Sequence, residues 1–249
     1  MMAPTEIGIV LLAGLIIFSG HLVKGVSGFG SALFSVPLLM LILDVKFITP
    51  VFLVFDCISG AILVASNYRS IHRRLLLLLL CGLLVGTAIG TWMLLSFSHD
   101  LLKRVLGVLV TAWALLALFR KERPINPTTH SRTMPYLAPL SGFLGGALGA
   151  MFSVNGPPII IYLSHVLRKK QVFRATLYSI FFADACYKVI LFTANGLLTG
   201  EVLRFALLMA PFLVAGTFAG SWLQTHIDDA LFKKVVALIL IVTGVILLV

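Results

Sequence analysis

The chain has 249 residues, of which 60% are hydrophobic and 11% are charged, and its mean hydropathy is +1.09. Soluble globular proteins carry roughly 25% charged residues, so this composition excludes that class and leaves little room for a soluble domain. The net charge of +10 does not indicate nucleic acid as a partner, because the basic residues cluster in short loops between apolar runs.

Apolar runs recur from one end of the chain to the other. They predict an all-α fold, a polytopic helical membrane protein, because helices satisfy their own backbone hydrogen bonds in lipid. Six runs have the length needed to cross a hydrocarbon core of about 30 Å. These runs are 48–66, 75–95, 101–119, 172–194, 203–224 and 231–249.

Two further apolar regions, 5–43 and 135–167, are interrupted near their middle by small residues and prolines. The interruptions lie at 25–31 and 153–158. Glycine and proline interrupt helices, so each region is predicted to be a broken hairpin of two short or tilted helices. Both a full crossing and a re-entrant hairpin are compatible with these sequences.

The two halves of the chain resemble each other. Residues 31–36 (SALFSV) resemble residues 149–154 (GAMFSV), and residues 86–92 (GTAIGTW) return as residues 216–222 (GTFAGSW). An internal duplication in a very apolar chain is typical of secondary transporters, whose substrate site lies where the repeats meet. The duplication therefore predicts a transporter.

The predicted organisation is a first membrane repeat over 1–119, a cytoplasmic linker over 120–134 and a second membrane repeat over 135–249. Thirteen of the 19 Lys and Arg residues fall in four loops, which the positive-inside rule places in the cytoplasm. These loops are 67–74, 120–132, 168–174 and 224–234. With this orientation both termini are periplasmic and the two repeats are inverted.

The two hairpin breaks are the predicted substrate site. A helix that restarts at a break presents unpaired N–H groups and the positive end of its dipole, which favours an anion. Lys24 precedes the first break, and a lysine at membrane depth is by default functional. The predicted substrate-binding residues are Lys24, Ser27, Gly28, Gly30, Ser31, Asn155, Gly156 and Pro157. Tight helix packing by small residues and snorkelling of the lysine are the structural alternatives.

Titratable residues within the apolar runs are predicted to couple or gate transport. Asp184 and Lys188 are four residues apart, so they share a helix face and can neutralise each other; the pair is either structural or a relay. Asp56 is the counterpart of Asp184 in the first half, and two carboxylates at matching depths would serve proton coupling. The full set is Asp56, Asp184, Lys188, His21 and Arg174.

One motif points to a different class of protein. Residues 25–28 (GVSG) match the GxSG pattern of rhomboid-type intramembrane serine proteases, in which Ser27 would need a histidine base such as His165. The second half has no counterpart of this serine. An intramembrane serine hydrolase and a passive anion channel are the alternatives to a transporter. No metal-ligand spacing and no phosphate-binding loop occur, so no metal or cofactor is predicted.

At the two breaks the chain resembles the sulfite exporter TauE/SafE family of membrane permeases. The resemblance rests on 25–31 followed by 36–39, on 145–149 followed by 155–158, and on 173–176 (FRAT). The chain departs from the family pattern in two places. The glycine triplet of the first break is thinned to Gly28, Gly30 and Ser31. The threonine-serine pair of the family's third segment is replaced around residues 54–56, which places an acid, Asp56, there.

The resemblance implies export of a small sulfur-containing anion, such as sulfite or an organosulfonate, across a bacterial inner membrane. The resulting hypothesis is a transporter and not an enzyme, in which the two inverted halves rock about a midplane site and give alternating access. The expected partners are the anion and membrane lipid, without nucleic acid, and a homo-oligomer stays open.

Overall fold

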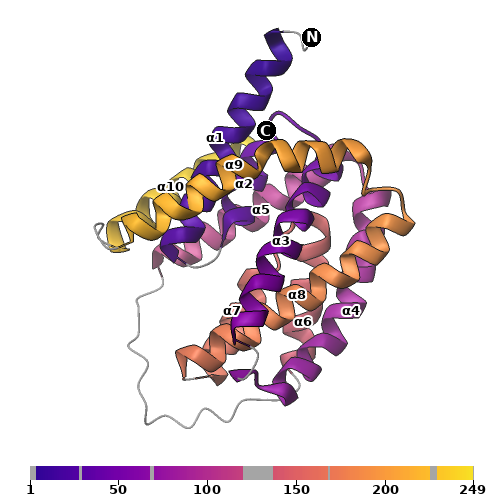
Figure 1. Cartoon of the computed structure of the whole chain (residues 1–249), viewed down its shortest axis with the longest axis vertical. Coiled ribbons are helices and arrows are strands. Elements are labelled where there is room, and N and C mark those ends of the chain that lie inside the picture. Colours follow the sequence, from indigo (N-terminus) through magenta and orange to yellow (C-terminus); the bar gives the residue numbers. More distant parts are fainter. Residues whose placement is uncertain are drawn as a thin grey trace. The chain divides into compact units, whose positions relative to one another are not determined.

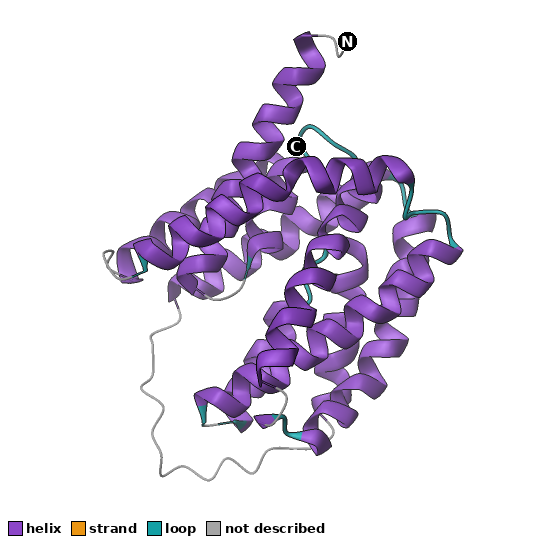
Figure 2. Ribbon diagram, viewed as in Figure 1, coloured by secondary structure: helices purple, strands orange, loops and turns teal. Residues whose placement is uncertain are grey.

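The computed structural model describes residues 4–27, 30–67, 70–119, 137–167, 169–224 and 229–248 (Figure 1). Within these ranges the regular structure is helical and no strand occurs, as Figure 2 shows, and the prediction of a polytopic all-α membrane protein is confirmed. The predicted linker 120–134 and the predicted site residue Gly28 lie outside the described residues.

The described part of the chain forms ten helices. They are α1 Pro4–Ser27, α2 Ser31–Leu39, α3 Val45–Asn67, α4 Arg73–Ser96, α5 His99–Phe119, α6 Leu137–Phe152, α7 Gly156–Val166, α8 Lys170–Ala194, α9 Gly200–Leu223 and α10 Asp229–Ile246. Each of the six predicted runs coincides with one helix, namely α3, α4, α5, α8, α9 and α10.

Of the helices described, five are long and apolar enough to cross a membrane: α1, α3, α4, α8 and α9. Four of these are predicted runs. The fifth, α1, is the first arm of a predicted hairpin, so this arm is not short. By contrast, α2 and α7 are about 14 and 17 Å long at 1.5 Å per residue, too short to cross a core of about 30 Å.

Both predicted hairpin breaks are confirmed. The first lies between Ser27 and Ser31, and the second lies over 153–155. One part of the repeat comparison is wrong in structural terms: residues 31–36 lie inside α2, whereas residues 149–154 cover the end of α6 and the break after it. A six-residue apolar match does not fix a helical register. Gly30 and Asn155, which each precede the second helix of a hairpin, are the structural counterparts.

The helices form two compact units, and each unit takes helices from both halves of the chain. Unit 1 comprises 1–48, 97–121 and 204–249, and unit 2 comprises 49–96 and 122–203. Unit 1 therefore contains α1, α2, α5, α10 and most of α9. Unit 2 contains α4, α6, α7, α8 and most of α3. The inverted symmetry of the two halves stays a prediction.

In unit 2, α4 and α6 pack with their backbones in direct contact. A side chain added at Gly82, Gly86 or Gly90 of α4 would overlap the backbone of α6 at Pro139, Phe143 and Ala147, respectively. Small residues allow membrane helices to approach this closely, and close packing is what holds them together in lipid.

The same kind of contact recurs in unit 1. Gly216 and Gly220 of α9 lie against the backbone carbonyls of Phe18 and Leu22 in α1. The duplicated Gly-Thr-x-x-Gly block therefore has a physical role in each half, because its two glycines carry a helix contact with the first arm of a hairpin.

The apolar core of unit 2 packs α7 and α8 against α4 and α6. Its buried members are Leu75, Leu79, Leu83, Ala138, Ile159, Tyr162, Leu163, Leu177 and Ile180. This core ends one turn before Asp184 on α8, where the buried side chains become polar.

Candidate functional site

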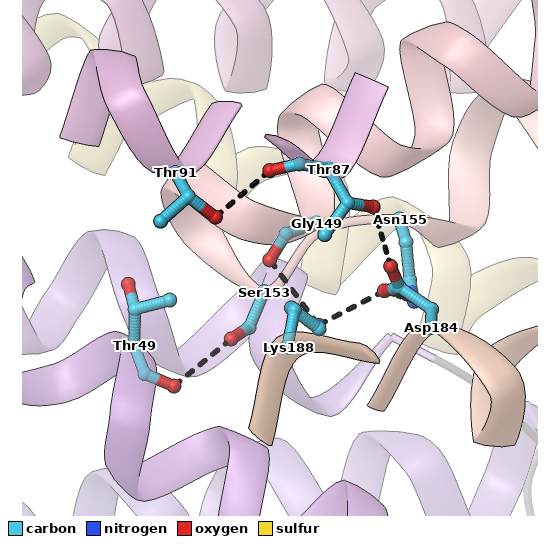
Figure 3. Close-up of polar contacts among 8 residues, drawn as sticks. All are labelled: Thr49, Thr87, Thr91, Gly149, Ser153, Asn155, Asp184 and Lys188. Atoms are coloured by element: carbon cyan, nitrogen blue, oxygen red, sulfur yellow. Dashed lines mark hydrogen bonds and ion pairs between the residues drawn. The ribbon is translucent and has the colours of Figure 1, made fainter. Parts of the chain in front are cut away.

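Asp184 of α8 is the centre of a buried polar network in unit 2 (Figure 3). Its side chain has no exposed surface. Oδ1 accepts a hydrogen bond from Thr87 Oγ1 at 2.7 Å, and Oδ2 accepts one from Asn155 Nδ2 at 3.1 Å. The carboxylate therefore links α8 to α4 and to the break before α7.

Lys188 completes this network with an opposite charge. Its Nζ lies 3.0 Å from Asp184 Oδ2 and donates to the Gly149 carbonyl oxygen at 3.3 Å, and the side chain is 1% exposed. The structure thus forms the ion pair that the four-residue spacing predicts. Two buried charges in contact are compatible with an apolar interior, whereas either charge alone would be very unfavourable.

Asn155 is available to Asp184 because of the prolines that follow it. It is the N-cap residue of α7, yet its side chain makes no capping hydrogen bond. An N-cap side chain normally accepts from the N–H of the second or third helical residue, and these are Pro157 and Pro158, which have none. The amide side chain donates to Asp184 instead.

Gly149 and Ser153 shape the end of α6 beside this pair. A Cβ at Gly149 would lie 2.8 Å from Asn155 Cβ and 3.1 Å from Asp184 Oδ2, so no side chain fits there. Ser153 has φ 56°, a left-handed conformation that glycine usually adopts after a helix. Its N–H donates to the Gly149 carbonyl at 3.0 Å. The Gly149 carbonyl therefore accepts hydrogen bonds from both Ser153 N–H and Lys188 Nζ.

The start of α3 is tied to the same break. Ser153 Oγ donates to the Thr49 carbonyl at 3.3 Å, and Thr49 Oγ1 donates to the Met151 carbonyl at 3.1 Å. Both side chains are buried. These two bonds fix the break against α3, which also carries Asp56.

Within unit 2, two of the predicted coupling residues stand outside the direct contacts of Asp184. Asp56 is half-buried on α3, where its charge interacts with Lys188. Arg174 is exposed near the start of α8, ten residues and hence about 15 Å along the helix from Asp184. The network therefore includes Asp184, Lys188 and Asn155, has Asp56 beside it and excludes Arg174.

The first break, in unit 1, has a different chemistry. Gly30 precedes α2 with φ 91°, a conformation that favours glycine. The first hydrogen bond of α2 runs from Phe34 N–H to the Gly30 carbonyl. The N–H groups of the first turn thus stand free of helical partners, and Gly30 has no side chain to cap them. Ser31 in this turn is buried.

The remaining predicted residues of unit 1 lie on α1. Lys24 is half-buried in its last turn, where a cation complements the helix dipole. His21 is buried and donates from Nδ1 to the Ile17 carbonyl at 2.9 Å. Ser27 ends the helix. The sequence predicts Lys24 directly before a break at 25–31, whereas in the structure α1 continues to Ser27 and Lys24 lies within its last turn.

Within the described residues, no group of three or more His, Cys, Asp or Glu side chains is placed to hold a metal ion. His165, the histidine considered as a catalytic base, is exposed on α7. Its Nδ1 donates to the Ile161 carbonyl at 2.7 Å.

Sequence reasoning missed Thr87 and Gly149 as members of the network. Thr87 stands in the duplicated glycine block as a hydroxyl inside an apolar run, which was the available signal. Gly149 contributes a backbone carbonyl, and because every residue has one, the sequence gives no signal for this role. Both are brought to Asp184 by tertiary packing of α4 and α6 against α8.

Comparison with known proteins assigns the chain to a family. Residues 12–247 match the family described as Sulfite exporter TauE/SafE. A relative from Comamonas testosteroni, named "Probable inner membrane transporter protein TsaS", is 26% identical over 180 residues, which cover 72% of this chain and 73% of the relative. No solved structure matches the chain. The chain belongs to the sulfite exporter TauE/SafE family, and it is a membrane transporter and not an enzyme.

Proposed function

We propose that this transporter is a permease that exports a small sulfur-containing anion, such as sulfite or an organosulfonate, across a bacterial inner membrane by alternating access. The observation that carries the proposal is the family match over 12–247, which names sulfite export. The relative from Comamonas testosteroni, an inner membrane transporter by name, supports the location.

The first break is the proposed main anion-binding element. The first N–H groups of α2 have no partner within the helix. Together with the positive end of the helix dipole, they favour an anion without the help of a charged side chain. Lys24, Ser27, Gly28, Gly30 and Ser31 are its proposed residues. Lys24 would supply the positive charge that attracts the substrate.

The second break contributes in another way. Pro157 and Pro158 leave the start of α7 without two of its usual N–H donors. Asn155 and Gly156 retain theirs, and Pro157 would contribute shape to the site. Asp56, Asp184, Lys188, His21 and Arg174 are proposed to couple or gate transport.

The proposed orientation has both termini in the periplasm, as the distribution of Lys and Arg favours. The proposed partners are the small anion and membrane lipid, with no nucleic acid, and self-association stays open. A passive anion channel is the competing mode, because a channel would also use helix ends and a lysine to select anions.

The test is uptake of radiolabelled sulfite by proteoliposomes that contain the purified full-length protein, with protein-free liposomes as the background. We expect uptake above background, and we expect Lys24→Ala to remove it while the protein stays folded. Lys169→Ala, which removes an exposed lysine at the start of α8, is the matched control. Uptake at the background level by the wild-type protein would contradict the proposal for sulfite. If Lys24→Ala takes up sulfite as fast as the wild type, Lys24 is excluded from the substrate-binding site.

A further inference from the structure

The ion pair of Asp184 and Lys188 restricts how an anion is able to bind in unit 2 and which second ion must accompany it. We infer that Asp184 carries a proton and that Lys188 is the countercharge of the transported anion, so that one proton moves with each anion. This inference rests on the proposed function and adds the coupling ion, its carrier and the stoichiometry.

The pair is neutral as a whole and closed to water. Asp184 and Lys188 are 0% and 1% exposed, and their charged atoms are 3.0 Å apart. The break before α7, α4 and α6 face the pair with the uncharged groups Asn155, Thr87 and Gly149. From α3, Asp56 and Cys57 are the titratable groups that interact with Lys188.

An anion that binds the Lys188 ammonium must replace the Asp184 carboxylate as its partner. Asp184 would then be a buried charge without a counterion, a state that proteins avoid by taking up a proton. A protonated Asp184 keeps Oδ1 as an acceptor for Thr87. The Gly149 backbone lies beside Oδ2, and its carbonyl, released by Lys188, is an acceptor for the new O–H.

Asn155 connects this exchange to the second break. Its amide donates to Asp184 Oδ2 at 3.1 Å, and it is the N-cap residue immediately before α7. An anion at this helix start would lie beside Asp184, because the Asn155 amide group has two hydrogens and could donate one to the anion and one to the carboxylate. The anion and the carboxylate would then be two negative charges at one amide group, an arrangement that a proton on Asp184 relieves.

The charge balance gives a distinctive prediction. A monoanion that moves with one proton transfers no net charge, so transport in proteoliposomes responds to a pH gradient and not to a membrane potential. Export from a cell would then run on the outward gradient of the anion itself. In Asp184→Asn the ammonium remains without a carboxylate, and the anion alone neutralises it. Transport by this variant should transfer one negative charge per anion and become insensitive to the pH gradient.

The experiment uses full-length protein in proteoliposomes, with methanesulfonate and sulfite as probes. Methanesulfonate is the more informative probe because it remains a monoanion at neutral and mildly acidic pH and carries no proton of its own. Proton movement is followed with a trapped pH dye, and a potassium gradient with valinomycin sets the potential. We expect one proton per methanesulfonate in the wild type, and in Asp184→Asn proton movement at the background level together with a response to potential.

Asp100→Asn, an exposed carboxylate on α5, is the matched control and should keep the wild-type stoichiometry. The double variant D184N/K188Q leaves no unpaired buried charge, so it replaces Asp184→Asn as the test if that variant does not fold. Because it lacks the Lys188 ammonium, it should lose anion uptake. Wild-type uptake without proton movement, or proton-coupled uptake by either Asp184 variant, would overturn the inference alone. If the wild type moves neither methanesulfonate nor sulfite, the result would contradict the proposed function and the inference with it.

Discussion

Asn155 donates its side-chain amide to Asp184 Oδ2 at 3.1 Å instead of capping the helix that it precedes. The cause is local, because Pro157 and Pro158 remove the two N–H groups that an N-cap side chain would bind. The consequence is long-range, since a break in one hairpin becomes connected to a buried ion pair on α8. The sequence Asn-Gly-Pro-Pro thus has a role beyond interrupting a helix.

The first prediction concerns this hydrogen bond. Asn155→Ala should lower the free energy of unfolding by about 1.5–3 kcal/mol, the usual contribution of a hydrogen bond to a charged group. Thermal unfolding of the purified protein in detergent measures the effect. Asn195→Ala is the control, since Asn195 is exposed and its amide donates to the Leu191 carbonyl. Equal midpoints for the two variants would show that the Asn155 bond adds nothing to stability.

The second prediction concerns the lysine of the ion pair. Lys188→Met leaves the Asp184 carboxylate buried without its counterion and should cost about 3–5 kcal/mol of stability. The loss should be smaller at low pH, where protonation removes the buried charge. The double variant D184N/K188M should be more stable than Lys188→Met at neutral pH. A double variant that melts at or below the temperature of Lys188→Met would contradict this account of the pair.

The third prediction concerns the contact between α4 and α6. Gly86→Val should prevent assembly of unit 2, because its side chain would overlap the Phe143 carbonyl. Gly200→Ala is the control, as a Cβ at Gly200 meets no atom within 4 Å. The measurement is the fraction of detergent-solubilised protein that elutes as a single species. A wild-type fraction for Gly86→Val would refute the close contact.

The fourth prediction concerns the left-handed residue at the second break. Ser153→Gly should keep or raise the melting temperature, because glycine avoids a strain of about 1–2 kcal/mol at φ 56°. The lost bond to the Thr49 carbonyl is long, at 3.3 Å, and offsets part of this gain. Ser153→Val should lower the melting temperature, since a β-branched residue is an outlier in this conformation. The reverse order of the two variants would be incompatible with the backbone geometry.

The fifth prediction concerns orientation. In a background without Cys57, Cys81 and Cys186, Asn195→Cys lies between α8 and α9, on the side assigned to the periplasm. A membrane-impermeant maleimide should label it in intact cells, whereas Thr128→Cys in the predicted cytoplasmic linker should react only after lysis. Labelling in the opposite order would invert the proposed topology.

Local sequence features account for much of the fold. The six predicted apolar runs and both hairpin breaks were predictable because length, glycine and proline act within a single segment. The Asp184–Lys188 pair was predictable for the same reason, since a spacing of four residues places two side chains on one helix face.

What was not predictable depends on contacts between distant segments. Thr87 reaches Asp184 across 97 residues of chain, and Gly149 contributes only a carbonyl to Lys188. The likeness between residues 31–36 and 149–154 was misleading, because apolar side chains recur in any membrane helix and do not specify a register.

The measurement that tests the central claim most directly is counterflow. Proteoliposomes are loaded with unlabelled sulfite and diluted into a trace of labelled sulfite, with the pH equal on both sides and the potential clamped. A transporter that alternates access should accumulate label transiently above its equilibrium level, because the outward movement of unlabelled anion returns the site to the outside. Uptake that rises to equilibrium without an overshoot would indicate a channel and contradict alternating access, and no uptake would contradict sulfite as the substrate.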